Sequence, residues 1–454
     1  MSSLGFPEEL NFQTLKSMYP SRKTEYRKAP MNSQTFNVAG QDIQLVLSMM
    51  ENSFYDPNTF CVNFTVDYGV TTGAVANNAA FLLGYAYSHF SRQVVRPLSG
   101  TPIETIDNPS LLANAVLNMT MDSNEKSALS TTMGFNDGNI HTNFGAQISN
   151  SNNLKVQSFS IPLIGCLNTA KFIPAFISDI EIDLTLNNFS NFIVDVNVLA
   201  AGTNPVTPSS AITGYTIKNV EIVCEVITLE ESGMQQILAM FPGQIKLKSQ
   251  SYLYGSSTLS GISDATTQDI TYSHSLNSLK SFIWWSSPAN ALGKNYAGVC
   301  PNLSSWQLLI GSTAYPQQLV KSTRPSECFM QNQKAFGSLY STSHCGSASK
   351  TQFARAYTAS NEYELYTPTQ GATATIAQTL ALPSNKWYQA LDLEIINNLK
   401  ETLYTGISTK GSTNTLRLNI ARALATQSHA VHFFSCFDVI LEFDYANQMI
   451  NVIQ

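Results

Sequence analysis

The sequence is poor in charged residues and lacks any long apolar run. Only 12% of its 454 residues are charged, whereas about 25% is typical of soluble domains. The most apolar stretch, residues 159–177, is interrupted by Asn168, Thr169 and Lys171. It is therefore too polar for a transmembrane helix, which needs about 18 or more consecutive apolar residues.

Signals of secretion, of a disulfide framework and of a zinc site are also missing. Residues 1–12 have no basic segment and no apolar core, so we expect no signal peptide. The 7 cysteines are scattered, odd in number and without a CxxC pair, which favours buried free thiols. The net charge of −6 argues against phosphate contacts spread over the whole surface.

Motifs of nucleotide-binding and hydrolytic enzymes are absent. The chain has no GxxxxGK[ST] loop, no GxGxxG motif behind a strand and no HExxH pair. His429 and His432 form one local pair, which we expect to be hydrogen-bonded within the fold rather than bound to a metal. The neighbours Trp284 and Trp285 would point to opposite faces of a strand, so core packing is favoured over a sugar-binding platform. We predict no enzymatic activity and no cofactor.

Uncharged polar residues take the place of the charged ones. Ser, Thr, Asn and Gln together number 153, about a third of the chain, and 43% of the residues are hydrophobic. This is too much apolar surface for a disordered polar tract. The sequence therefore predicts a folded, loop-rich protein with a neutral polar surface.

Apolar and polar residues alternate with the period of a β-strand. In residues 179–187 the alternation has no exception, which predicts a strand with one face in water. Residues 215–228 and 431–444 repeat the pattern near the ends of the two halves of the chain. Further strands are predicted at residues 43–47, 60–68, 155–161, 282–285, 306–310 and 416–420.

Three helices are predicted. Asn108 as cap and Pro109 as first residue start one that ends near Met121. A second starts with a capping box from Thr228 to Glu231 and ends before Pro242 and Gly243. A third, weaker helix is predicted over residues 387–403, where the apolar pattern also fits a strand. The second helix divides the chain into two strand-rich halves of similar length.

The N-terminal segment differs from the rest. Within 13 residues it carries five cations against the single acid Glu25, and it shows little apolar periodicity. We interpret residues 1–34 as an arm outside the domains. Its cations are Lys16, Arg22, Lys23, Arg27 and Lys28.

Several segments resemble the double jelly-roll major capsid proteins of icosahedral double-stranded DNA viruses, in the branch of virophages, polinton-like viruses and nucleocytoplasmic large DNA viruses. The first half contributes FSIPLIGCLNTAKFIPAF and DIEIDLTL at residues 159–186, and GYTIKNVEIVCEVITL at residues 214–229. The second half contributes WQLLIGSTAYP at residues 306–316 and VHFFSCFDVILEFDYANQMINV at residues 431–452. The likeness is a pattern of strand order spread over residues 35–454.

This resemblance implies an all-β fold of two consecutive eight-stranded jelly-roll sandwiches, with long loop insertions and few short helices. It implies a first jelly roll at residues 35–228, a linker helix at 229–245 and a second jelly roll at 246–454. Residues 81–155, 255–281 and 337–371 would hold the long outer loops.

The implied function is that of a structural major capsid protein in the virion, made in the host cytoplasm or nucleus. Its partners would be two further copies in a trimeric, pseudo-hexagonal capsomer, neighbouring capsomers, and minor capsid and penton proteins. The five cations of the arm would lie on the inner face of the shell, against an internal membrane or the genome.

Other classes remain open. A minor capsid or penton protein usually has one jelly roll, and a receptor-binding virion protein should show fibrous repeats or a single head. A carbohydrate-active β-sandwich should show a signal peptide and two convergent carboxylates.

Overall fold

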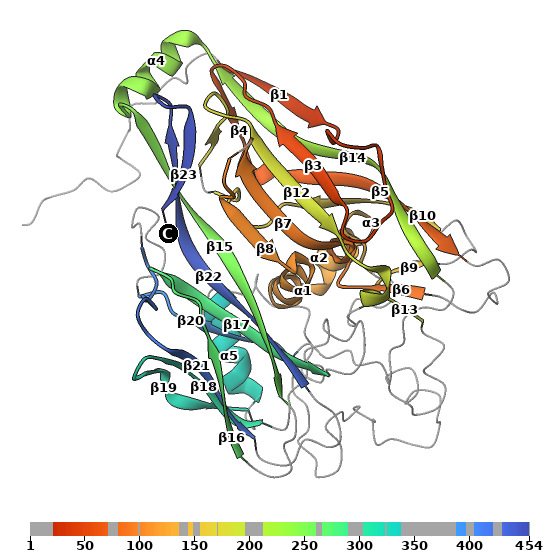
Figure 1. Ribbon diagram of the computed structural model, residues 1–454, viewed down its shortest axis with the longest axis vertical. Coiled ribbons are helices and arrows are strands. Elements are labelled where there is room, and N and C mark those ends of the chain that lie inside the picture. The colour runs from red at the N-terminus through yellow and green to blue at the C-terminus, as the bar shows by residue number, and fades with distance from the viewer. Residues whose placement is uncertain are drawn as a thin grey trace, which may run out of the picture.

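A computed structural model describes most of the chain (Figure 1). The described residues are 21–70, 80–98, 100–135, 144–148, 155–169, 171–195, 212–259, 266–288, 303–322, 325–336, 387–395, 404–420 and 429–453.

Two facing sheets are built from the first half of the chain. One contains, in spatial order, β1 (Ser21–Lys28), β14 (Ile212–Leu229), β5 (Cys61–Val70) and β10 (Val156–Pro162). The other contains β3 (Asp42–Leu47), β12 (Ile180–Leu186), β7 (Phe90–Pro97) and β8 (Glu104–Asp107). The sheets meet through apolar side chains: Phe64 of β5 packs edge-on against Phe90 of β7, with ring centroids 5.4 Å apart.

The second half forms another pair of facing sheets. One contains β15 (Gln244–Leu259), β22 (His429–Asp444), β17 (Leu279–Pro288) and β20 (Gln389–Asp392). The other contains β16 (Thr266–Tyr272), β21 (Asn414–Ile420), β18 (Leu303–Ile310) and β19 (Thr313–Lys321). Trp284 of β17 and Trp306 of β18 join them at 5.4 Å between ring centroids.

Both halves have the same strand order. Counted along the chain, the first, eighth, third and sixth of these eight strands form one sheet, and the second, seventh, fourth and fifth form the other. This is the order of a jelly roll, in which eight antiparallel strands close two sheets over one core. The predicted fold of two jelly rolls is therefore confirmed, and the equal order supports a duplication that the residues alone do not reveal.

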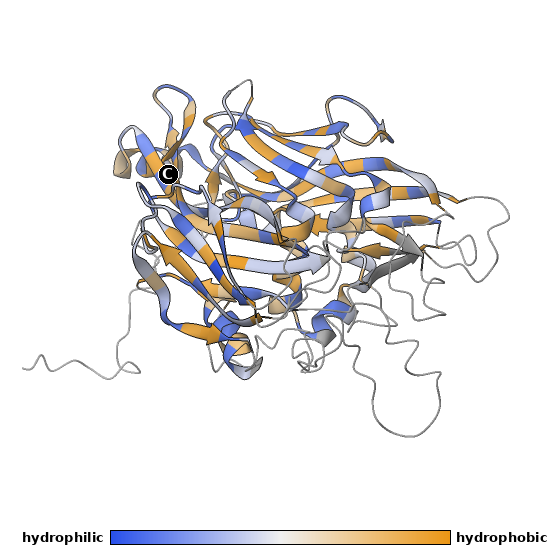
Figure 2. Ribbon diagram, turned by 60° about the horizontal axis from the view of Figure 1, so that its bottom comes forward, coloured by the Kyte–Doolittle hydropathy of each residue, from blue (hydrophilic) through white to orange (hydrophobic). Residues whose placement is uncertain are grey.

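Shorter elements are added to this frame. The additional strands are β2 (Thr35–Phe36), β4 (Ser53–Tyr55), β6 (Ala80–Leu83), β9 (Phe144–Ile148), β11 (Ile173–Pro174), β13 (Ile193–Asp195) and β23 (Met449–Ile453). The helices are α1 (Pro109–Thr120), α2 (Ser123–Ala128), α3 (Ser130–Met133), α4 (Glu231–Met240) and α5 (Pro325–Phe336), with 3₁₀ turns at Pro57–Thr59, Ala86–His89 and Phe189–Asn191. Figure 2 shows the expected alternation of hydrophobic and hydrophilic residues along the strands.

The prediction of a wet face on the strand at residues 179–187 is wrong. Glu181 and Asp183 of β12 are buried, at 7% exposure each. The reason is Arg96 on the neighbouring strand β7, whose guanidinium lies 3.0 Å from a carboxylate oxygen of Glu181 and 2.9 Å from one of Asp183. Because both carboxylates pair with this cation, they can be buried on the face of β12 that was predicted to be in water.

The two expected helix caps are corrected. Helix α1 begins at Pro109 as predicted, but the side chain of Asn108 makes no capping bond. Thr228 does not cap α4, because it is still part of strand β14 and its hydroxyl lies 2.9 Å from that of Ser53. The N-cap position of α4 is held by Glu230, again without a capping bond from the side chain.

The third predicted helix and two of the predicted loop regions are also corrected. Residues 389–392 form strand β20, paired with β17, because their side chains are buried in a sheet, and residues 396–403 of the predicted helix lie outside the described residues. Strands β7 and β8 lie within residues 81–155, and β16 lies within 255–281, so neither range is one insertion. The long connection of the first half is residues 108–155, with α1 to α3 and β9. Residues 337–371 lie outside the described residues.

The interpretation of residues 1–34 as an arm is wrong for its second part. All eight residues of β1 pair with β14, from Ser21 opposite Leu229 to Lys28 opposite Ile222. The hydroxyl of Tyr26 also donates to the carbonyl of Val46 at 3.0 Å and accepts from the amide of Ser48 at 3.0 Å. This segment is the first strand of the first jelly roll.

Two truncations test this assignment. Deleting residues 2–28 removes β1 and leaves the edge of β14 unpaired, so we expect aggregation or loss of soluble protein. Deleting residues 2–20 keeps β1 and should lower the melting temperature much less. Equal melting temperatures of the two truncated proteins in thermal denaturation would contradict the role of β1.

Candidate functional site

The predicted arm cations that the structure describes lie on β1 and are largely matched by acids of the same subunit. Lys23 forms an ion pair with Glu225, and Arg27 lies 3.5 Å from Glu221. Both acids belong to β14, about 200 residues further along the chain. Exposed pairs such as these contribute at most about 1 kcal/mol to stability. Their main effect is to neutralise positive charge on β1.

The other three cations differ from one another. Lys28 donates to the hydroxyl of Ser48 at 2.5 Å. Arg22 is exposed, and Lys16 lies outside the described residues. The structure therefore brings Arg22, Lys23, Arg27 and Lys28 onto one strand, but the cluster is less basic than its sequence indicates.

The two jelly rolls are joined by a buried carboxylate. Glu104 of β8 is 4% exposed and accepts the backbone amide of Cys166 at 2.9 and 3.1 Å. Ser251, on β15 of the second jelly roll, donates its hydroxyl to the same carboxylate. Ser249 on β15 donates to the carbonyl of Cys166 at 2.6 Å. Figure 1 shows β8 and β15 side by side at this junction.

The surroundings of Glu104 leave no room for a larger neighbour. Gly165 has φ of +114°, and a Cβ added there would lie 2.2 Å from a carboxylate oxygen of Glu104. Burial raises the pKa of Glu104 to about 7, although the hydrogen bonds from Ser251 and Cys166 act in the opposite direction. Glu104 thus exchanges its proton near neutral pH inside the contact between the jelly rolls.

Helix α1 of the first half and helix α5 of the second half also make hydrogen bonds near this junction. Asn114 of α1 donates to the hydroxyl of Tyr388 at 2.7 Å. Asn332 of α5 donates to the carbonyl of Tyr388 at 2.7 Å and accepts the amide of Ala390 at 2.6 Å. The buried side chains of Asn114, Asn332 and Tyr388 are thus all hydrogen-bonded, as burial of polar groups requires.

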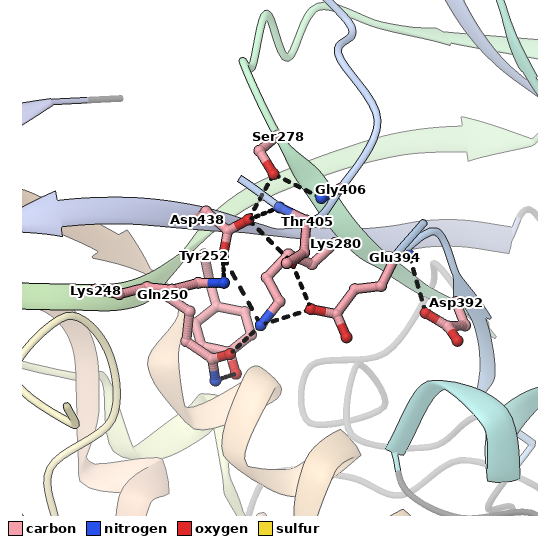
Figure 3. A network of polar contacts seen from close by, with 10 residues as sticks. All are labelled: Lys248, Gln250, Tyr252, Ser278, Lys280, Asp392, Glu394, Thr405, Gly406 and Asp438. Carbon is pink, nitrogen blue, oxygen red and sulfur yellow. Dashed lines mark hydrogen bonds and ion pairs between the residues drawn. The ribbon is translucent and has the colours of Figure 1, made fainter. Parts of the chain in front are cut away.

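A polar network lines a cavity at the same junction (Figure 3). The cavity has a volume of about 260 Å³. The ammonium group of Lys280 lies 3.1 Å from Glu394 and 3.9 Å from Asp438. Lys248 lies 3.5 Å from the same oxygen of Asp438. The cavity is lined by Val116, Gln250, Tyr252, Lys280, Ser281, Ile283, Ala335, Phe336, Asp392, Glu394 and Cys436.

Asp438 organises this network. Its second carboxylate oxygen accepts the hydroxyl of Ser278 at 2.6 Å and the amide of Thr405 at 2.9 Å. Burial lowers the pKa of Lys280, but nearby Cys436, Glu394 and Asp438 together raise it above its ordinary value. Three segments far apart in sequence are thereby tied to one buried charge on β22.

The arrangement is that of a structural core. His429 bonds to Ser286 at 3.1 Å and His432 to Ser287 at 2.9 Å, which confirms the expected pairing within the fold. Trp284 and Trp285 are fully buried, as predicted.

Within the described residues no group of His, Cys, Asp and Glu side chains suits a metal ion. In the same part of the chain, no helix has the length and apolar character needed to cross a bilayer.

Sequence reasoning missed Glu104, Lys280 and Asp438. The only local signal for Asp438 was an acid at a position between the apolar residues of a clean strand pattern. Such a residue is usually assigned to the wet face. Only the folded chain shows that this carboxylate is covered, by Ser278, Lys280 and Thr405.

The fold is similar over nearly the whole chain to solved structures of viral capsid proteins. A chain of the PBCV-1 virus capsid matches with a TM-score of 0.60 and 11% identity, over 98% of this chain and 99% of that one. The Faustovirus major capsid protein matches with 0.58 and 8%, over 95% and 92%, and the mavirus major capsid protein with 0.53 and 12%, over 100% and 95%. No protein-family model and no curated protein matches the sequence. The chain thus has the fold of the double jelly-roll capsid proteins.

Replacing Glu104 should change how stability depends on pH. The pKa of Glu104 rises from 4.5 to about 7 in the folded state. Between these pH values the folded protein binds the proton more tightly than the unfolded chain, so the parent protein loses stability as the pH rises through this window. The loss is on the order of 3 kcal/mol at most. Glu104→Gln should remove it, so chemical denaturation at pH 5 and pH 8 should show the variant gaining on the parent at pH 8. The exposed control Glu51→Gln should not change how stability depends on pH. If stability of Glu104→Gln changed with pH as it does in the parent, Glu104 would not be the group responsible.

Removing the carboxylate of Asp438 should be strongly destabilising. Asp438→Ala removes the buried carboxylate that Lys248 and Lys280 share and leaves Ser278 and Thr405 without this acceptor, a loss of the kind that typically costs about 3–5 kcal/mol. Thermal denaturation should show a melting temperature lower by about 3–5 °C in a chain of this length. The matched control is Asp269→Ala, which removes a surface pair with Arg417 and should cost about 1 kcal/mol or less. Similar losses in both variants would show that the network contributes no more than a surface pair.

Proposed function

We propose that the protein is a structural major capsid protein that assembles into trimeric capsomers of an icosahedral virus shell. The observation that carries the proposal is the presence of two jelly rolls of equal strand order in one chain, joined side by side through buried contacts. Three such subunits place six jelly rolls around one axis, which yields a unit of hexagonal outline. Such a unit can tile a flat facet.

The strand pairing supports a division of the subunit into two jelly rolls and a linker. We assign residues 21–229 to the first jelly roll, α4 to the linker and residues 244–453 to the second. No sheet of the described residues mixes strands from both halves. The polar contacts around Glu104 and Tyr388 would hold the two as one rigid building block.

The composition is suited to repeated burial of the surface. Charged groups are expensive to desolvate at an interface unless they are paired, and this chain has few of them. Neutral Ser, Thr, Asn and Gln side chains can bond across a contact at a lower desolvation cost. The protein would therefore act through its surfaces, as scaffold and not as catalyst.

The proposed partners are two further copies of the chain, neighbouring capsomers, and minor capsid and penton proteins. Contact of the N-terminal segment with an anionic membrane or genome remains a prediction. It now depends mainly on Lys16 and Arg22, because Lys23 and Arg27 have acidic partners on β14.

The oligomeric state tests the proposal. Light scattering of the purified protein should give three times 49.7 kDa, and negative-stain images should show particles of hexagonal outline. Size-exclusion runs over a range of concentrations serve as the control for weak association. A monomer at all micromolar concentrations would contradict the capsomer model.

A further inference from the structure

An uncharged edge strand is exposed at one end of the second jelly roll. Strand β23 pairs with β22 through residues 449–453, and β22 is its only strand partner among the described residues. Its sequence, Met-Ile-Asn-Val-Ile, contains neither a charged residue nor Pro. Free edges of this kind pair readily with another strand, and most proteins protect them with Lys, Pro or a covering segment.

Exposed apolar side chains lie on β23 and at the end of α4. Met449 and Ile453 of β23 are 53% and 39% exposed, and Met240 and Phe241 at the end of α4 are 69% and 50% exposed. The hydroxyl of Tyr445, in the turn between β22 and β23, donates to the carbonyl of Phe241 at 3.1 Å. This bond ties the end of α4 to the β22–β23 turn. We call the four exposed side chains and the edge of β23 the α4–β23 surface.

Ser21, the first described residue, lies near the start of α4. Ser21, the first residue of β1, lies opposite Leu229, and α4 begins two residues after Leu229. Figure 1 shows the start of β1, α4 and β23 at the same end of the molecule. The twenty residues before Ser21 can span up to about 60 Å when extended, which is ample to cross the length of α4.

The sequence of residues 1–20 has the apolar content to cover the surface. Leu10 and Phe12 alternate with Glu9, Asn11 and Gln13, as in a strand with one apolar face. The other large apolar residues of the segment are Leu4, Phe6, Leu15, Met18 and Tyr19.

We propose that residues 1–20 of the chain dock on the α4–β23 surface and add a strand to the free edge of β23. The main-chain hydrogen bonds of the added strand would satisfy the open edge, and Leu10 and Phe12 would cover Met449 and Ile453. The segment would thereby link the first strand of the first jelly roll to the last strand of the second. This inference concerns a single chain and does not depend on the proposed role in a capsid.

Photo-crosslinking of the full chain tests the occupant. With p-benzoylphenylalanine in place of Met449, mass spectrometry should find crosslinked peptides from residues 1–20. The matched control carries the same group in place of Val156, which is 52% exposed on β10, and should give no such product. Crosslinks from position 449 to β23 of a second copy, or to any other segment, would overturn the proposal.

Hydrogen exchange provides a second, independent measurement. Deleting residues 2–20 should accelerate exchange of the amides of residues 449–453 at least tenfold, while the amides of β21 keep their rates. The full-length variant Leu10→Ser with Phe12→Ser should show the same direction with a smaller change. Unchanged exchange at residues 449–453 in both proteins would contradict the added strand, whether or not the protein forms trimers.

Discussion

The pairing of the last strand of each half with its first and third strands is the constraint on which the structure depends. Strands β14 and β22 each lie in the middle of a sheet, and β14 bonds to β1 on one side and β5 on the other. β22 bonds to β15 and β17 in the same way. Each jelly roll is thus complete only when residues about 200 positions apart meet, which costs loop-closure entropy before the contacts form. The many buried apolar side chains of these two strands supply the burial that offsets this cost.

Two jelly rolls in one chain must also adhere to each other, and this protein achieves it with few but buried polar groups. Glu104 reaches across to Ser251, and Asn114 reaches across to Tyr388. A buried polar group costs free energy unless it is bonded, so these contacts favour one relative placement over others. Apolar packing alone would hold the halves together with less preference for a single arrangement.

Charge is used sparingly and in matched positions. The cations of β1 face acids of β14, Arg96 serves two acids of β12, and Asp438 serves two lysines. Because charges are few and many of the described ones are paired within the subunit, the outer surface can remain largely neutral and polar. Such a surface suits a protein that buries much of itself against other copies.

The sequence by itself determined the strands with clean alternation, the start of α1 at Pro109 and the all-β class, because side-chain period and proline geometry are local properties. It also favoured buried positions for Trp284, Trp285 and the histidine pair. The tertiary structure alone decided that β1 belongs to a sheet, since its partner strand β14 lies about 200 residues further along the chain. It likewise decided that Glu181, Asp183 and Asp438 are covered, and that residues 389–392 form a strand. Alternation shows that a strand has two different faces, but which face is buried depends on what packs against it.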